Sequence, residues 1–111
     1  MKSRRGRFPI SSMQRSKYLE ELQNAIRAVH GCESHYVSTS RVRGMLEDRL
    51  AWQGEVETFD LVGHPKAKRC HAWGDEENGQ LHTTTVLELP PVDSPVDAVN
   101  VAIAAKARMA K

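Results

Sequence analysis

The stretch that decides the fold is KAKRCHAWGDEENGQLHTTTVLEL, residues 66–89. Two strand-like runs flank the pair Asn78–Gly79, and both residues of this pair tolerate a positive φ. Such a pair between two strands predicts a β-hairpin closed by a two-residue turn. The remaining elements can be placed outward from this antiparallel hairpin.

Two further strand-like segments precede the hairpin. Residues 34–43 (SHYVSTSRVR) are rich in β-branched residues, and residues 50–62 (LAWQGEVETFDLV) form a longer run. Between them, residues 44–49 (GMLEDR) contain Gly44 and an acidic pair, which predicts a turn or a single helical turn. These segments add two strands to the predicted sheet.

A helix is expected at each end of the chain. Between Ser16, a candidate N-cap, and Gly31, a candidate C-cap, apolar residues recur at three- and four-residue spacing. At the other end, Ser94 caps a second helical segment that begins at Pro95. The sequence therefore predicts an α+β fold of order α-β-β-β-β-α. About four antiparallel strands form the sheet, and both helices pack on one face of it.

Charge is distributed unevenly along the chain. The formal net charge is +2, yet residues 1–17 hold six of the sixteen Lys and Arg residues and none of the fourteen acidic ones. We therefore expect a basic, disordered tail over residues 1–12 and a single α+β domain over residues 13–111. A basic tail on an acidic body can contact nucleic acid. The candidate contacts are Arg4, Arg5 and Arg7.

The segment GHPKAKRCHAW, residues 63–73, concentrates cations, histidines and a tryptophan. If it continues as a strand, Arg69, His71 and Trp73 share one face, because side chains alternate between the faces of a strand. A guanidinium beside an indole can hold an anion or stack a base. The same residues also fit a turn followed by a half-solvated strand. The candidate residues for binding an anionic ligand or nucleic acid are His64, Lys66, Arg69, His71 and Trp73.

Cysteine and histidine form another set of potentially reactive residues. His30, Cys32 and His35 lie close together in sequence, and Cys70 is adjacent to His71. A zinc protein or a small enzyme is therefore an alternative. However, the spacing matches no familiar zinc motif, and adjacent strand residues point to opposite faces. We predict no metal ligands, no catalytic residue and no cofactor, and expect both cysteines to be small buried residues.

The last predicted helix is apolar around much of its circumference, so it must be covered on more than one side. Together with the sheet edges, this predicts a homodimer. No run approaches the roughly 18 apolar residues of a membrane span, so no membrane partner is expected. No export signal is recognisable, and a cytoplasmic location is expected.

One segment carries a family resemblance. The pattern W-x-G-x-V-x-x-F-x-L-x-G-H-P-K-A-x-R-C, from Trp52 to Cys70, resembles a segment of small uncharacterised bacterial proteins. The resemblance covers most of the chain from Ile26 onward and implies a bacterial, cytoplasmic setting. It implies no activity and no functional residue.

These observations favour a small, non-enzymatic binding or assembly module that forms a dimer. The alternative is a nucleic-acid-associated protein that uses the basic tail together with the sheet face of Arg69 and Trp73. A second alternative is a small enzyme or zinc protein that uses Cys32, Cys70 and nearby histidines.

Overall fold

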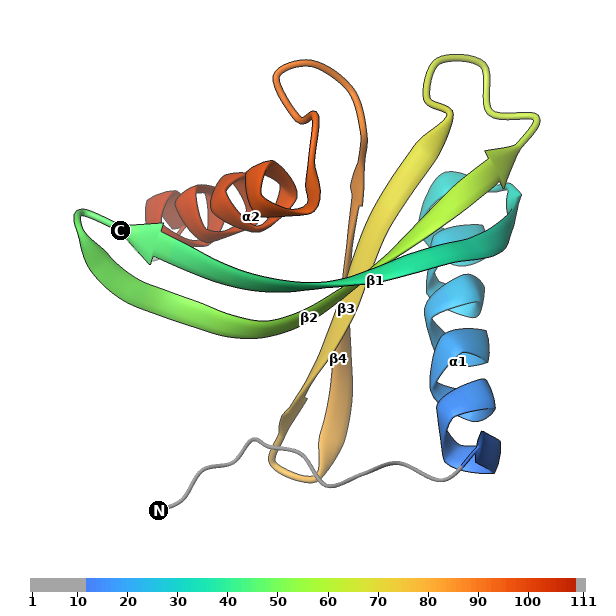
Figure 1. Ribbon diagram of the computed structural model, residues 1–111, viewed down its shortest axis with the longest axis horizontal. Coiled ribbons are helices and arrows are strands. Elements are labelled where there is room, and N and C mark those ends of the chain that lie inside the picture. Colours follow the sequence, from blue (N-terminus) through green and yellow to red (C-terminus); the bar gives the residue numbers. More distant parts are fainter. Residues whose placement is uncertain (1–11, 110–111) are drawn as a thin grey trace.

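A computed structural model describes residues 12–109 as two helices and one four-stranded sheet. Figure 1 shows the elements, which are α1 (Ser12–His30), β1 (Glu33–Leu46), β2 (Arg49–Val62), β3 (Arg69–Glu77), β4 (Gln80–Leu87) and α2 (Pro95–Met109). The strands lie in the order β1-β2-β3-β4, and each pairs antiparallel with its neighbour. The predicted α+β class and element order are confirmed. The tail contacts Arg4, Arg5 and Arg7 lie outside the described residues.

The β3–β4 hairpin has the predicted turn. Asn78 and Gly79 adopt φ values of 55° and 78°, and Glu77 pairs with Gln80 on either side of them. Positive φ at both central residues is the geometry of a type I′ turn, whose twist matches that of the flanking strands. The local sequence therefore determines this hairpin.

The β1–β2 hairpin closes within the segment 44–49, where a turn or a single helical turn is predicted. Its turn residues are Glu47 and Asp48, both with positive φ, and not Gly44. Gly44 lies inside β1, where an added Cβ would overlap the side chains of Ile103 and Val99 on α2. The glycine is required there by the close approach of β1 to α2.

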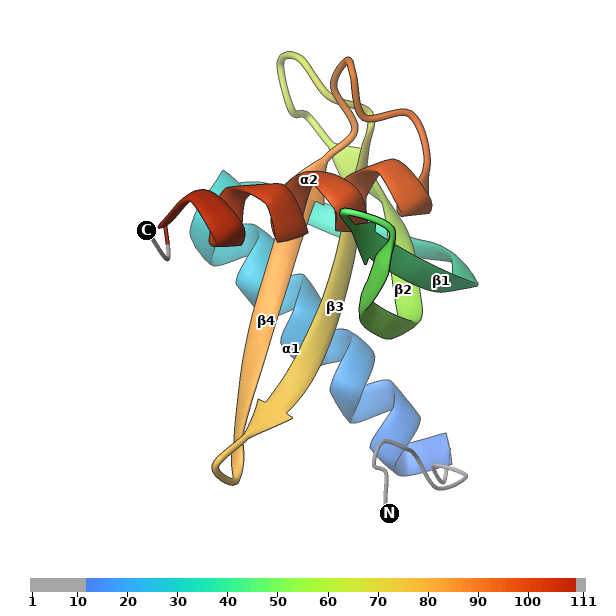
Figure 2. The same cartoon turned by 90° about the vertical axis from the view of Figure 1, so that its left-hand side faces the viewer.

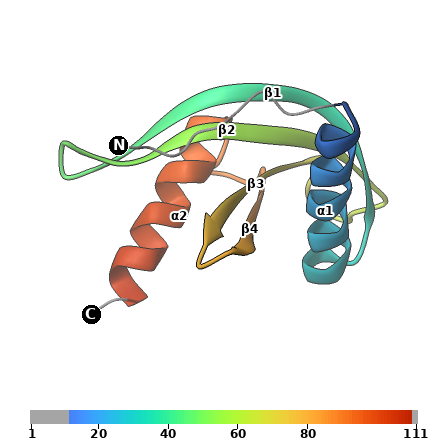
Figure 3. The same ribbon diagram turned by 90° about the horizontal axis from the view of Figure 1, so that it is seen from below.

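The two helices pack on opposite faces of the sheet, which corrects the expectation that they share one face. On β3, Cys70 belongs to a core cluster with Leu22 of α1, whereas Trp73 belongs to a second cluster with Val99 of α2. Side chains alternate along a strand, so these clusters mark opposite faces. Figure 3 shows α1 and α2 on either side of the β3–β4 hairpin. The sheet therefore separates two core clusters.

Helix α1 begins one turn before the expected cap at Ser16, and this turn brings Arg15 into the helix. The helix crosses the sheet diagonally, from Glu57 on β2, which bonds to Arg15, to Thr85 on β4, which bonds to His30. Within residues 12–109, neither helix is both long and apolar enough to cross a membrane.

Candidate functional site

His64 and Lys66, two of the candidate binding residues, lie in the loop between β2 and β3. Nδ1 of His64 accepts hydrogen bonds from the backbone N–H groups of Lys66, at 3.1 Å, and Ala67, at 2.9 Å. Because the imidazole caps its own loop, one of its ring nitrogens is already occupied. The side chain of Lys66 is exposed.

His71, the third candidate, is buried and bonded on both sides. Its Nε2 lies 2.9 Å from Oε1 of Glu88, and its Nδ1 lies 2.9 Å from the hydroxyl of Thr58. An ionised carboxylate can only accept, so Nε2 donates to Glu88, and in the neutral ring the Thr58 hydroxyl donates to Nδ1. Only 2% of His71 is exposed, so the ring joins β2, β3 and the segment after β4 instead of facing a ligand.

Arg69 and Trp73 are the remaining candidate binding residues. The structure does not bring them together on an open surface. Trp73 is buried, with its ring centroid 5.6 Å from that of Trp52. Arg69 is exposed, and its Nε donates to Asp60 at 3.0 Å. Helix α2 covers the sheet face on which the indole lies.

Of the residues considered for a metal or nucleophile, Cys70 and His30 serve the fold, whereas Cys32 is only half-buried, which corrects the expectation that both cysteines are buried. Burial raises the pKa of the Cys70 thiol to about 12, so the thiol stays protonated and is a poor nucleophile and ligand. His30 bonds to Thr85 at 2.8 Å. Its pKa is lowered mainly by burial and, to a smaller extent, by the neighbouring His64. Among residues 12–109, no three His, Cys, Asp or Glu side chains are grouped so as to hold a metal.

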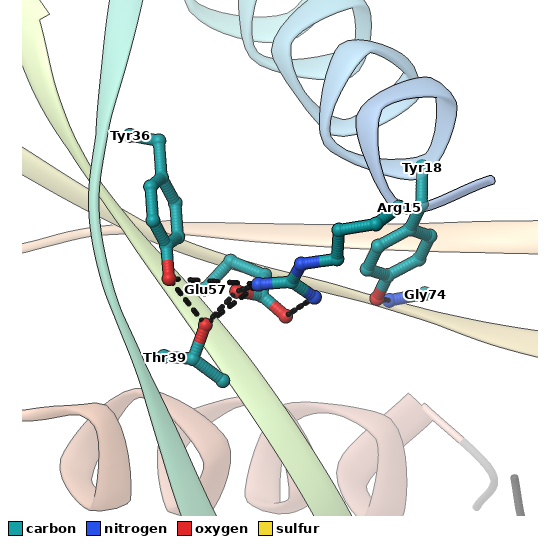
Figure 4. A network of polar contacts seen from close by, with 6 residues as sticks. All are labelled: Arg15, Tyr18, Tyr36, Thr39, Glu57 and Gly74. Carbon is teal, nitrogen blue, oxygen red and sulfur yellow. Dashed lines mark hydrogen bonds and ion pairs between the residues drawn. The ribbon is translucent and has the colours of Figure 1, made fainter. Parts of the chain in front are cut away.

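A polar network that the sequence did not reveal joins α1 to β1 and β2 (Figure 4). Glu57 is completely buried, and its two oxygens accept from Arg15 at 2.9 and 3.1 Å. The Thr39 hydroxyl also donates to Glu57, at 2.5 Å, and lies 2.6 Å from the Tyr36 hydroxyl. The hydrogen bond to Glu57 raises the pKa of Arg15. No local pattern predicts this ion pair, because its partners lie 42 residues apart.

Farther along the same face of the β1–β2 hairpin, none of the described residues covers the sheet. Arg41 and Arg43 are exposed on either side of Val42, which is buried towards α2, so they project from the opposite face. Together with Gln53, which pairs with Arg43 in register, they line a shallow depression. None of the ion pairs among residues 12–109 involves either arginine. Within the described part of the chain, two guanidinium groups without an ion-pair partner therefore flank a shallow depression on the sheet.

Comparisons of the chain with models of known protein families, with curated proteins and with solved structures give no match. The resemblance of the Trp52–Cys70 segment to small bacterial proteins therefore stays a prediction. The geometry of the β1–β2 face remains the basis for a functional proposal.

Proposed function

We propose that the protein is a small, non-enzymatic binding module whose recognition surface is the uncovered face of the β1–β2 hairpin. The observation that carries the proposal is the pair Arg41 and Arg43, which project side by side without a carboxylate partner among the described residues. A guanidinium presents a planar fork of donors that matches carboxylate and phosphate groups. The ligand is therefore an anion.

The spacing of the two arginines favours a ligand with more than one anionic group. Residues two apart on a strand lie about 6.6 Å apart along it, so each guanidinium can take its own acidic group. The amide of Gln53, opposite Arg43, can add a donor and an acceptor. Glu55, opposite Arg41, places one negative charge at the other end of the surface. The anionic groups of the ligand therefore lie over the two arginines of β1 and away from Glu55 on β2.

The environment of the chemically reactive residues supports a binding role. The Glu57 carboxylate is neutralised by Arg15, the His71 ring is bonded on both sides, and the Cys70 thiol is buried. These groups have internal partners or lie away from solvent, whereas the arginines of the β1–β2 face are open. We also propose that the protein is located in the reducing cytoplasm, which is in keeping with Cys32 and Cys70 being free thiols.

The proposal is tested by titrating the protein with inorganic tripolyphosphate and measuring binding by calorimetry. Each charged hydrogen-bonding partner contributes about 1.5 kcal/mol or more, so Arg41→Gln and Arg43→Gln should each weaken binding about tenfold. Arg27→Gln, which removes an exposed arginine from α1, is the matched control and should leave the affinity unchanged. No binding by the wild-type protein, or equal weakening by the control, would reject the proposal.

The same titration separates a nucleic acid from other anions. A labelled single-stranded oligonucleotide replaces tripolyphosphate, and a further variant carries glutamine at Arg4, Arg5 and Arg7 in the otherwise complete chain. If nucleic acid is the ligand, the affinity falls steeply with salt, and the tail variant reduces that dependence. Binding of tripolyphosphate but not of the oligonucleotide would favour a small anionic ligand.

A further inference from the structure

We propose that two copies of the chain pair antiparallel through the free edge of β4 and so form one continuous sheet across a homodimer. This interface is independent of the β1–β2 face and of the anion that we assign to it. The proposal assigns the interface of the expected homodimer to a particular strand and a particular register.

The outward backbone groups of β4 follow from its pairing with β3. The N–H of Glu88 donates to the carbonyl of Arg69 at 2.9 Å, which identifies Arg69 and Glu88 as a hydrogen-bonded pair. Such pairs alternate along an antiparallel ladder, so the backbone groups of Leu81, Thr83 and Thr85 point away from β3. None of the described backbone hydrogen bonds outside the helices and ladders involves these three residues.

The β4 edge also lacks the features that normally keep an edge strand from pairing. Residues 80–87 (QLHTTTVL) contain no Lys, Arg, Asp, Glu or Pro, and the β3–β4 ladder has no register shift. The opposite edge, β1, carries Arg41 and Arg43 and has two register shifts against β2. Of the two edges of the described sheet, β4 is therefore the one suited to accept another strand.

The chemistry of β4 fits a second copy of itself. In an antiparallel arrangement with its two-fold axis at Thr83, Thr83 faces Thr83 of the second copy, and Leu81 faces Thr85 of the second copy. This register pairs outward-pointing residues with one another and keeps each face continuous across the interface. It brings no two Asp, Glu, Lys or Arg side chains into opposition, and threonine pairs across strands can hydrogen-bond.

The same register covers exposed apolar side chains. Leu81 is 43% exposed on β4, and Val29 is 66% exposed in the last turn of α1. His30, next to Val29, bonds to Thr85, so this turn of α1 lies over the part of β4 that would face Leu81 of the second copy. The hairpin end of β4 is exposed, and it lies at the opposite end of the strand from the C-terminal turn of α1 (Figure 2). The last turn of α1 in one copy therefore covers the exposed hairpin end of β4 in the other copy.

The test is the molar mass measured by light scattering on a size-exclusion column. The wild-type protein should have twice the 12.5 kDa chain mass. Thr83→Pro removes an outward N–H that bonds to none of the described backbone groups of the same chain, and edge strands tolerate proline in that orientation. This variant should have the molar mass of a monomer and should be folded, as judged by circular dichroism. Thr83→Ala, which keeps the N–H, should remain a dimer.

A second variant keeps the test decisive if Thr83→Pro fails to fold. Thr83→Lys is a substitution at an exposed side chain, and it would place two like charges opposite each other at the two-fold axis. We expect it to halve the molar mass without loss of secondary structure. A wild-type monomer across a wide concentration range, or a folded Thr83→Lys dimer, would overturn the proposal.

Discussion

The guanidinium of Arg15, in the first turns of α1, lies against the carboxylate of Glu57, which is completely buried in the middle of β2. Two hydrogen bonds, at 2.9 and 3.1 Å, join the two side chains. A buried carboxylate is costly unless it is paired and hydrogen-bonded. The pair therefore anchors the start of α1 and allows a charged residue to occupy a central strand.

Replacing Arg15 should destabilise the fold because the Glu57 carboxylate would lose its counter-charge. We expect Arg15→Ala to lower the free energy of unfolding by about 3 kcal/mol, the lower end of the range for a broken buried pair, because Arg15 is partly exposed. Arg15→Lys should cost less, since it keeps the charge but loses the two-pronged contact. Urea unfolding measures both changes.

The exposed pair Arg27–Glu33 provides the control for that experiment. Its N–O distance is 2.7 Å, but both side chains are at least half exposed. Exposed pairs contribute about 0–1 kcal/mol, so Arg27→Ala should change stability little. Equal losses for the two alanine variants would contradict the assigned role of Glu57 burial.

Features that depend on neighbouring residues could be predicted from the sequence. The Asn78–Gly79 turn, the element order and the alternation of Cys70 with His71 and Trp73 all follow from local preferences. The opposite placement of the helices could not be predicted in this way. Val56 to Phe59 are buried on both faces of β2, yet two of these four residues are polar, so no continuous apolar run reveals a doubly covered strand.

The candidate site was less accessible to sequence reasoning than the fold. The sequence predicts His71 and Trp73 on an open face. In the structure, α2 covers that face, and the His71 ring is hydrogen-bonded to Glu88. These contacts join residues from separate elements, and no local spacing encodes them. Arg41 and Arg43 could have been found from their i, i+2 spacing on a strand, had the buried face of Val42 been known.

The β1–β2 turn should be open to stabilisation. Glu47 and Asp48 adopt φ values of 51° and 65°, a conformation that costs residues other than glycine about 1–2 kcal/mol each. Glu47→Asn combined with Asp48→Gly supplies the preferred type I′ pair, so we expect a gain of about 1 kcal/mol and a rise in Tm of about 4 °C. Thermal unfolding measures this gain. Gly79→Ala, in the turn of the β3–β4 hairpin, is the comparison and should lower the Tm, because Gly79 has a positive φ. A lower Tm for the double variant would count against the turn geometry.

The two thiols should differ in reactivity. Cys70 is buried with its pKa raised to about 12, whereas Cys32 is half-buried. In native buffer, one thiol per chain should react with an aromatic disulfide reagent, and the second should react only after unfolding. Cys32→Ser should leave no reactive native thiol. If this variant reacted equally fast in native buffer and in denaturant, the described burial of Cys70 would be wrong.

Stability should fall as the pH falls through the range in which an unfolded histidine titrates. The pKa of His30 is lowered by burial and by His64, so the unfolded chain takes up the proton first, near about pH 6.5. The contribution of His30 is present above that pH and is lost below it. The wild-type protein should therefore lose more stability than His30→Gln between about pH 8 and about pH 5.

Urea unfolding at several pH values measures this dependence. His82→Gln is the control, because His82 is exposed at the hairpin end of β4. It should retain the wild-type pH dependence. If His30→Gln and the wild-type protein showed identical pH dependence, the assigned effect of burial on His30 would be wrong.

The most direct measurement of the central claim, that the β1–β2 face binds an anion, is an NMR titration of the ¹⁵N-labelled protein with tripolyphosphate. The side-chain Nε–H signals of Arg41 and Arg43 and the amide of Gln53 should shift, while the indole N–H of buried Trp73 stays in place. Shifts centred on residues 64–73, or no shift at Arg41 and Arg43, would contradict the claim.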